Sequence, residues 1–395
     1  MNNSAPSSER TFISFFGAVN AGKSSVVNRF INQPLSIVSE KAGTTTDPVI
    51  KSMELLPIGP VSVCDTAGLD DNTELGELRL EKTYEILRKT DIAVLVVDSS
   101  KGLSDCDSAL VEKFKEAKIS YIICYNKSDL SSVKLTGGNE ISVSAVTGEG
   151  IEALKNMVAS FADKGEKVIV ADLVEPGKYV VLVTPIDEAA PKGRLILPQQ
   201  LVLRELLDAD VPVVVTKETE LVKALDGLKE KPQAVITDSQ VFEYVRTVVP
   251  EDVYLTSFSI LMQRYKGVLG ASLDGVGTLD KLKDRDKVLI CDGCTHHRQC
   301  NDIGTVKLPA WIRKYTGKEL DFNFTQGGHY PKDLKEYSLI VHCGGCMLNE
   351  REMLFRMKTA VSERVPFTNY GLVIAKINGI LDRSVRILQK RRENK

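Results

Sequence analysis

An eight-residue segment near the start of the chain has the composition of a phosphate-binding loop. It reads Gly-Ala-Val-Asn-Ala-Gly-Lys-Ser over residues 17–24, after a strand-like apolar run and before a helix-like one. This context distinguishes a nucleotide loop from a chance Gly-rich turn. Its glycines let backbone N–H groups wrap around phosphates, Lys23 can reach the β- and γ-phosphates, and the Ser24 hydroxyl can bind Mg²⁺. We expect nucleotide contacts from Gly17, Asn20, Ala21, Gly22, Lys23, Ser24 and Ser25.

A second segment, Asp65-Thr66-Ala67-Gly68, follows the apolar run 61–64. Asp65 is placed to hold Mg²⁺, and the Gly68 N–H to sense the γ-phosphate. We expect Lys23, Thr45, Asp65 and Gly68 to be the catalytic residues. Leu69 stands where Ras-like enzymes have a water-orienting glutamine, so we expect slow intrinsic hydrolysis.

Two further segments predict that the base is guanine. Asn126-Lys127-Ser128-Asp129 ends a strand-like run, and the carboxylate of Asp129 can accept two N–H bonds that guanine offers and adenine does not. Ser144-Ala145 then supplies a backbone N–H near the guanine O6. Four motifs in this order predict GTP rather than ATP.

This part of the chain resembles the GTPases of the Era, Der and MnmE class. Residues 43–47, Gly-Thr-Thr-Thr-Asp, resemble their switch I segment, although Thr46 replaces the usual arginine. The resemblance implies that Thr45 binds Mg²⁺. It also implies that Asn20 binds K⁺, which would supply positive charge beside the phosphates. Alternatively, Asn20 only tolerates a left-handed turn.

A third group of reactive side chains lies far downstream. Five of the eight cysteines and all four histidines fall between residues 291 and 346. The two segments are Cys291-Asp-Gly-Cys294-Thr-His296-His297-Arg-Gln-Cys300 and His342-Cys343-Gly-Gly-Cys346, and His329 lies between them. Each segment follows a strand-like run, so the ligands would converge at the carboxyl edge of a parallel sheet. The residues alone fit either a zinc site or an iron–sulfur cluster.

Length and periodicity describe the elements that must position these groups. The chain has 395 residues, 43% hydrophobic and 26% charged, with a net charge of −2, as expected for several globular domains. Strand-like and helix-like runs alternate, which predicts an α/β fold with parallel sheets. We expect a cytoplasmic protein with no membrane or nucleic-acid partner, because there is no signal-like segment, long apolar run or basic excess.

The whole chain resembles the HydF family of FeFe-hydrogenase maturation GTPases. The specific part is Cys294-x-His296 followed by His342-Cys343-x-x-Cys346. The resemblance implies that Cys294, Cys343 and Cys346 bind a 4Fe–4S cluster. His296 and His342 would lie beside it, as a labile ligand or in contact with the ligands. Cys291 and Cys300 lie outside the family motif, and their roles stay open, as do those of His297 and His329.

The resemblance also gives the domains and the function that we expect. The domains are a parallel-sheet P-loop GTPase domain (1–165), a linker (166–177), a small α/β dimerisation domain (178–267) and an α/β iron–sulfur domain (268–395). The protein would be a homodimeric scaffold that receives a diiron precursor made with the radical-SAM maturases HydE and HydG. It would deliver this precursor to the apo FeFe-hydrogenase, with GTP hydrolysis regulating the exchange.

A different class of function fits the nucleotide motifs equally well. The chain could be a GTPase of RNA modification or ribosome assembly, with an accessory domain stabilised by zinc. No RNA-binding signature or basic excess supports this alternative. A redox enzyme with a catalytic cluster is a third possibility, for which the sequence offers no substrate pocket.

Overall fold

The computed structural model describes residues 6–32, 48–68, 74–162, 167–186, 195–294, 302–331 and 333–393, with side chains except at 74–81 and 390–393. The chain forms two compact units, Met1–Gly165 and Glu166–Lys395. Each is described by itself. No helix in the described ranges has the length and apolar character needed to cross a membrane.

The first unit contains a six-stranded sheet with the order β2-β3-β1-β4-β5-β6. Neighbouring strands are parallel except for the edge strand β2, which is antiparallel to β3. Long apolar runs explain the central strands, because a parallel sheet is covered on both faces. The strands are β1 (Thr11–Phe16), β2 (Val49–Leu55), β3 (Gly59–Asp65), β4 (Ile92–Asp98), β5 (Ser120–Asn126) and β6 (Glu140–Ser142).

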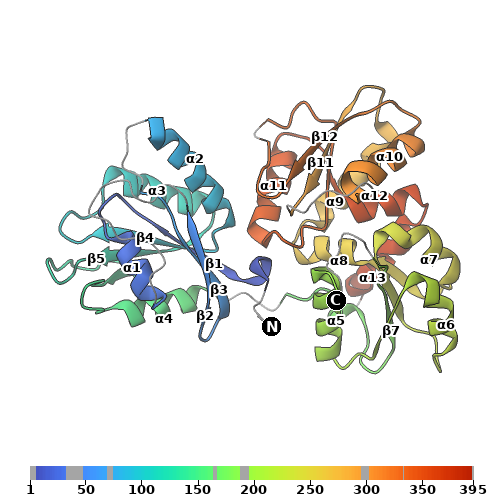
Figure 1. Ribbon diagram of the computed structural model, residues 1–395, viewed down its shortest axis with the longest axis horizontal. Helices are drawn as coiled ribbons and strands as arrows, with labels where there is room; N and C mark the ends of the chain where they lie inside the picture. The colour runs from blue at the N-terminus through green and yellow to red at the C-terminus, as the bar shows by residue number, and fades with distance from the viewer. Residues whose placement is uncertain are drawn as a thin grey trace. The chain divides into compact units, whose positions relative to one another are not determined.

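Helices cover both faces of this sheet (Figure 1). Apolar side chains of α1 (Lys23–Phe30) and α4 (Ile151–Phe161) pack in one core, and those of α2 (Glu74–Lys89) and α3 (Asp105–Glu116) in another. The first residues after β1, β3 and β5 all emerge at the carboxyl edge of the sheet. Phe15 pairs with Asp65, and Asp98 with Asn126. This register brings the nucleotide motifs to one edge.

The second unit contains two four-stranded parallel sheets, β10-β9-β7-β8 and β12-β11-β13-β14. If the strands of each are numbered in chain order, both sheets have the order 2-1-3-4, a shared topology that the sequence does not reveal. The first sheet has β7 (Val180–Val183), β8 (Val213–Thr216), β9 (Ala234–Thr237) and β10 (Tyr254–Ser257). The second has β11 (Lys287–Asp292), β12 (Asp321–Gln326), β13 (Leu339–His342) and β14 (Phe367–Asn369).

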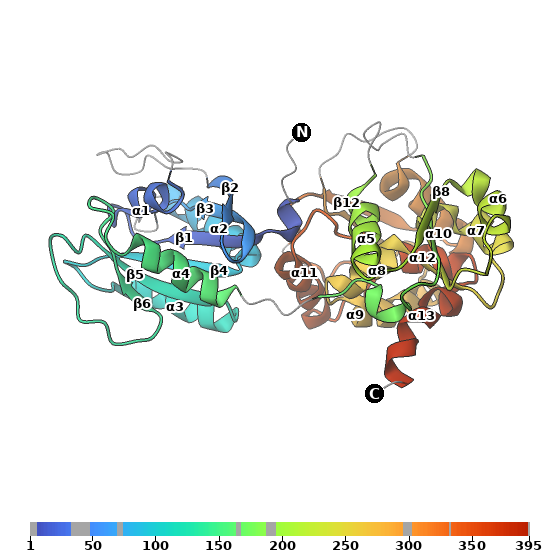
Figure 2. The same ribbon diagram turned by 90° about the horizontal axis from the view of Figure 1, so that it is seen from below.

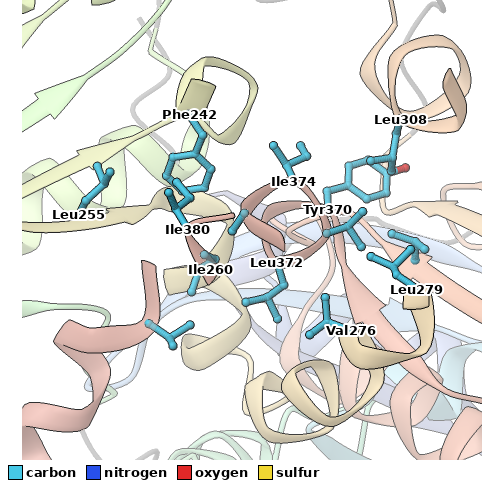
Figure 3. Close-up of a cluster of buried hydrophobic side chains, with 14 of the residues drawn as sticks. Phe242, Leu255, Ile260, Val276, Leu279, Leu308, Tyr370, Leu372, Ile374 and Ile380 are labelled. Atoms are coloured by element: carbon cyan, nitrogen blue, oxygen red, sulfur yellow. The ribbon is translucent and has the colours of Figure 1, made fainter. Parts of the chain in front are cut away.

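The helices of the second unit fill the crossovers between its strands and the space between its two sheets. They are α5 (Leu197–Asp208), α6 (Leu221–Asp226), α7 (Phe242–Val248), α8 (Phe258–Tyr265), α9 (Leu269–Val276), α10 (Leu308–Thr316), α11 (Glu350–Ser362), α12 (Tyr370–Ile377) and α13 (Leu381–Glu393). One apolar core joins the two sheets. Figure 3 shows Phe242 and Leu255 from the first sheet's elements packed in the same cluster as Leu308 and Leu372 from the second's.

Some elements differ from those that the sequence predicts. Residues 372–389 have the periodicity of one continuous helix, and this interpretation is wrong. The helices α12 and α13 are separate, because Gly379 adopts a φ of +68° between them. The helix α13, within the predicted iron–sulfur domain, packs against β10 of the first sheet (Figures 1 and 2). Residues 169–174, within the predicted linker, contribute buried side chains to the same core as Ile387.

Candidate nucleotide site and metal centre

The phosphate-binding loop joins β1 to α1 and contacts the end of β3. Lys23 is buried, with its Nζ 3.5 Å from Asp65 Oδ1. The Ser24 hydroxyl donates to Asp65 Oδ2 at 2.7 Å. The structure thus brings together the three groups predicted to bind phosphate and Mg²⁺. A cation, a hydroxyl and a carboxylate in this arrangement suit a magnesium–phosphate complex.

Gly68 lies directly against the phosphate-binding loop. A Cβ at this position would lie 2.6 Å from Val19 Cγ2 and 3.2 Å from the Val19 N and Cα atoms. Only glycine allows this approach of two backbones without displacement. The position of Gly68 is therefore consistent with an N–H that senses the γ-phosphate. Thr45 and Leu69 lie outside the described residues.

The residues predicted to read guanine gather beside this loop. Asn126 donates through Nδ2 to Ala21 O at 3.0 Å and accepts at Oδ1 from Ala145 N at 3.1 Å. The Ser144 hydroxyl donates to Asp129 Oδ1 at 2.6 Å. The loop 144–146 and the segment 126–129 are therefore held against each other and against the phosphate-binding loop.

Lys127 extends toward the phosphate-binding loop and Asp98. Its Nζ donates to Asn20 O at 3.0 Å and to Asp98 Oδ2 at 2.6 Å. Burial acts to raise the pKa of Asp98, but hydrogen bonds from Lys127 and Ser100 outweigh it and hold this pKa at about 2. Sequence reasoning missed Asp98; its position as the last residue of a buried strand was the available signal.

Other predicted contacts lie in the same segment. Gly17 follows β1 directly, Ser25 lies in the first turn of α1, and Asn20 is exposed. Asn20 has a φ of +66°, in the left-handed region. This conformation fits both the potassium interpretation and the alternative, in which the asparagine only suits the turn.

The candidate metal centre lies at the carboxyl edge of the second four-stranded sheet. Strands β11 and β13 are parallel neighbours, and Cys291 pairs with His342. In the 2-1-3-4 order, the chain leaves β11 toward one side of the sheet and β13 toward the other. The gap between these two strands is therefore the topological switch point, where open α/β sheets bind ligands. Cys294 follows β11, and Cys343 and Cys346 follow β13. The backbone N–H of Gly293 donates to Cys343 Sγ at 3.0 Å, so the two segments touch.

The turn after Cys343 is tightly constrained. Gly345 has a φ of +66° and donates its N–H to Cys343 Sγ at 3.4 Å. A Cβ on Gly345 would lie 2.5 Å from Met353 Sδ. The Cys343-Gly-Gly-Cys346 turn therefore requires glycine at this position, both for its conformation and for its packing.

The three predicted ligands influence one another electrostatically. Burial, with smaller contributions from Cys346, Asp292 and Asp302, raises the pKa of Cys294 to about 12. Burial likewise raises the pKa of Cys343, with contributions from Asp292 and both other thiols. Bound metal would supply the positive charge that thiolates need in such surroundings.

Three thiols form the donor set at this edge of the sheet. Such a set suits a 4Fe–4S cluster, in which each thiolate binds a different iron. Within the described ranges, no three Cys, His, Asp or Glu side chains lie close enough to hold one metal ion. The candidate ligands His296, His297 and Cys300 lie outside these ranges.

Cys291 lies in the core rather than at the site. Its side chain is fully buried, in an apolar cluster that includes Leu289 and Ile340. Because side chains alternate along a strand, Cys291 shares a face with Leu289. Burial raises its thiol pKa to about 12. Cys291 therefore lies in the apolar core, which argues against a Cys₄ zinc site that includes it.

His342 is fully buried, and both its ring nitrogens contact protein groups. Arg356 Nη1 lies 3.2 Å from Nε2, and Cys343 O lies 3.0 Å from Nδ1. A guanidinium only donates, so Nε2 accepts and Nδ1 carries the proton. Burial, and then Arg356, lower the pKa of His342 to about 3. This arrangement makes His342 a support for the Cys343 backbone.

Sequence reasoning missed the buried charges behind this histidine. The Arg356 guanidinium donates to Glu352 Oε1 at 2.9 Å and to Gly327 O at 2.6 Å, and it lies 5.2 Å from the ring centroid of Tyr330. On the Cys294 side, the buried Tyr370 hydroxyl donates to Asp292 Oδ1 at 2.8 Å. These groups support both cysteine segments.

The remaining predicted residues are elsewhere or outside the described chain. His296, His297 and Cys300 fall in the segment 295–301, outside the described residues. His329 is exposed, and its Nδ1 lies 3.1 Å from Thr325 Oγ1. The Thr325 hydroxyl also approaches His329 O at 2.6 Å, so His329 has a local role in its turn.

Comparison with known protein families assigns the two parts of the second unit. The family model described as the hydrogen maturase F dimerization domain matches residues 169–267, and that of the hydrogen maturase F tetramerization domain matches residues 270–387. Together these matches span more than half of the chain. The chain belongs to the hydrogen maturase F family. The model described as a 50S ribosome-binding GTPase matches residues 12–127, and the first unit is a GTPase domain.

Relatives outside the hydrogen maturase F family share the GTPase domain. A tRNA modification GTPase MnmE of Nitrosomonas europaea is 35% identical over 145 residues, covering 35% of this chain and 32% of the relative. The MnmE of Clostridioides difficile is 34% identical over 158 residues, covering 38% and 34%. The chain thus spans about a third of the length of these curated relatives. A solved structure of Aquifex aeolicus Era bound to GDP and AlF₄⁻ is 19% identical, with a TM-score of 0.36, and covers 60% of this chain and 97% of its own.

Proposed function

We propose that this GTPase is a scaffold and carrier in maturation of the FeFe-hydrogenase. Membership of the hydrogen maturase F family implies a role in hydrogenase maturation. In the proposal, the second unit holds a 4Fe–4S cluster and a diiron precursor, which passes to the apo-hydrogenase. The radical-SAM maturases HydE and HydG supply the precursor. The family matches after residue 168 favour this function over an RNA-directed GTPase. Only the similarity of the first unit to other GTPases supports that alternative.

In the GTPase site, we assign the phosphates and Mg²⁺ to Lys23, Ser24 and Asp65, with Thr45 as a further magnesium ligand. Lys23 stabilises charge that develops on the phosphates, and Gly68 senses the γ-phosphate. Asp129 and the Ala145 N–H select guanine. Asn20 binds K⁺, which adds positive charge during hydrolysis.

In the metal centre, Cys294, Cys343 and Cys346 would hold the cluster. When bound, a 4Fe–4S cluster supplies an iron with a replaceable ligand, the chemistry that a carrier of a second metal fragment needs. The chain's own contribution is positioning. The hydrogen bond between Tyr370 and Asp292 holds the Cys294 turn, while His342 and Arg356 hold the Cys343 backbone. We assign His296 to the neighbourhood of the cluster.

The proposed domain limits are 1–165 for the GTPase, 166–177 for a linker, 178–267 for dimerisation and 268–395 for the cluster. The family descriptions of the second unit as dimerization and tetramerization domains indicate self-association. A homodimer would form through the first of them.

The observation that carries the proposal is that Cys294, Cys343 and Cys346 all follow β11 and β13, two parallel neighbours that meet at the switch point of the sheet. Anaerobic reconstitution with iron and sulfide tests it, followed by metal analysis and EPR spectroscopy. We expect about four irons per chain and the spectrum of a reduced 4Fe–4S cluster. A chain that takes up one zinc ion and no iron–sulfur cluster would refute the proposal.

A further inference from the structure

One contact in the GTPase domain joins the helix after the phosphate-binding loop to the loop that reads the base. Arg29, in the last turn of α1, donates through Nε to Ala145 O at 2.9 Å and through Nη2 to Val146 O at 2.8 Å. These residues are separated by more than a hundred positions in sequence. The fork of the guanidinium thus binds two successive carbonyls.

The hydrogen bonds within the loop use other groups than the Ala145 and Val146 carbonyls, which accept from Arg29. The Ser144 carbonyl accepts from Gly148 N at 2.8 Å, and Ser144 N donates to Glu149 O at 3.0 Å. These bonds close the turn around residues 144–149. The carbonyls of 145 and 146 point out of this turn toward α1, where Arg29 meets them.

Ala145 is therefore held on both sides of its Cα. Its N–H donates to Asn126 Oδ1 at 3.1 Å, and its carbonyl accepts from Arg29. Asn126 is itself tied to Ala21 of the phosphate-binding loop. These two hydrogen bonds restrain the backbone of Ala145, whose N–H is assigned to the guanine O6. Apolar packing contributes little to this segment, because Val146 is 74% exposed.

We propose that Arg29 is a positioning residue for guanine recognition: by holding the Ala145 and Val146 carbonyls, it places the loop 144–146, whose Ala145 N–H donates to Asn126 Oδ1, beside the position assigned to the base. It does not touch the nucleotide. The inference rests on the proposed assignment of Ala145 to the guanine O6. Its effect is confined to ligands that carry this oxygen, because the phosphate contacts lie at the other end of α1.

Three diphosphates separate this role from general stabilisation of the fold. GDP offers O6, N1–H and the 2-amino group. IDP keeps O6 and N1–H, and 2-aminopurine riboside diphosphate keeps the 2-amino group but lacks both O6 and N1–H. Dissociation constants are measured on the full chain, by competition with a fluorescent GDP analogue. The variants are Arg29→Ala, Arg29→Lys and the matched surface control Lys115→Ala, which loses only an exposed ion pair with Glu112 on α3.

For Arg29→Ala we expect binding of GDP and IDP to weaken about tenfold, because two charged hydrogen bonds that orient the loop are lost. Binding of the 2-aminopurine nucleotide should change less than about twofold. Arg29→Lys should restore part of the loss, since an ammonium can reach one carbonyl, and Lys115→Ala should match the wild type.

Equal weakening of all three ligands in both Arg29 variants, or no weakening, would overturn the role of Arg29. A wild-type chain that binds GDP and the 2-aminopurine nucleotide equally would instead overturn the assignment of Ala145. Thermal unfolding without nucleotide shows whether each variant folds. If Arg29→Ala does not fold, the dissociation constants of Arg29→Lys for the same three ligands decide the question.

Discussion

The guanidinium of Arg356 donates to Nε2 of His342 at 3.2 Å, and this contact fixes the tautomer of a histidine next to a predicted cluster ligand. The other nitrogen, Nδ1, donates to the Cys343 carbonyl at 3.0 Å. Both nitrogens are thus used by protein groups. We therefore expect His342 to shape the loop rather than to bind iron.

Replacement of His342 tests this distinction. A glutamine can accept from Arg356 and donate to the carbonyl, so His342→Gln should keep the iron content and EPR spectrum of the wild type. His342→Leu removes one of the three acceptors of the buried Arg356 guanidinium and should lower stability by about 1–3 kcal/mol. Iron analysis, EPR and chemical unfolding measure these effects. An altered spectrum in His342→Gln would show that the imidazole binds the cluster.

The cysteines should fall into two classes. Replacement of Cys294, Cys343 or Cys346 by serine should each remove most of the reconstituted iron, because a thiolate ligand is lost. Cys291→Ala should keep the iron but lower the free energy of unfolding by about 1 kcal/mol, because a buried side chain in the core becomes smaller. Loss of the cluster in Cys291→Ala, with a folded chain, would make Cys291 a ligand.

The Tyr370 hydroxyl should matter through the Cys294 turn. Tyr370→Phe removes the donor to Asp292 and leaves the ring in place, and the loss should be about 1–3 kcal/mol because the carboxylate is buried. We also expect faster loss of iron to a chelator than in the wild type. The exposed Tyr315, which donates to Asp280, provides the matched control as Tyr315→Phe. Equal chelation rates in both variants would contradict a role at the turn.

Potassium should accelerate GTP hydrolysis if Asn20 binds it. Replacing K⁺ by Na⁺ at constant ionic strength should lower the turnover of the wild type about tenfold or more, because an electrostatic contribution to the transition state is lost. Asn20→Asp would keep an oxygen ligand, whereas Asn20→Gly suits the left-handed turn without supplying one. The glycine variant should be slow in both salts. Equal wild-type rates in both salts would leave the asparagine with only a conformational role.

Asp98 should contribute the same stability throughout the neutral range. Its pKa of about 2 lies below the ordinary value of 3.8, so its contribution is fully present above pH 3.8 and is lost as the pH falls through 2. Asp98→Asn should therefore lower the free energy of unfolding of the GTPase domain by about 2 kcal/mol, equally at pH 5 and pH 8. A difference that shrinks between pH 8 and pH 5 would place the pKa much higher. Urea unfolding at both values provides the measurement.

The sequence predicted the parts of both sites that depend on local motifs. The nucleotide segments could be placed because each follows a recognisable buried strand, and the carboxyl ends of parallel strands meet. Arg29 and Arg356 could not be predicted in this way, since a charged side chain carries no local sign of a distant partner. For Asp98 the signal was its place at the end of a buried strand. The role of Cys291 was left open: the Cys-x-x-Cys spacing suggests a pair with Cys294, but residue 291 belongs to β11 and faces the core.

The elements of the second unit show a similar division. Apolar runs predicted the central strands, whereas the edge strand β12 was missed because four of its six side chains are exposed. Periodicity alone could not separate α12 from α13, because the break depends on the conformation of one glycine. The shared core of the two sheets could not be predicted either, because it depends on three-dimensional packing between separate sheets.

The position of α13 has a consequence for synthesis of the protein. Ile387 lies in the same buried core as Val180 and Ile236, from strands made much earlier. The first sheet of the second unit therefore lacks part of its apolar cover until α13 has been synthesised. The GTPase domain can complete its own core earlier in translation. A chain that stops before α13 would have a complete first unit but an incompletely packed second unit.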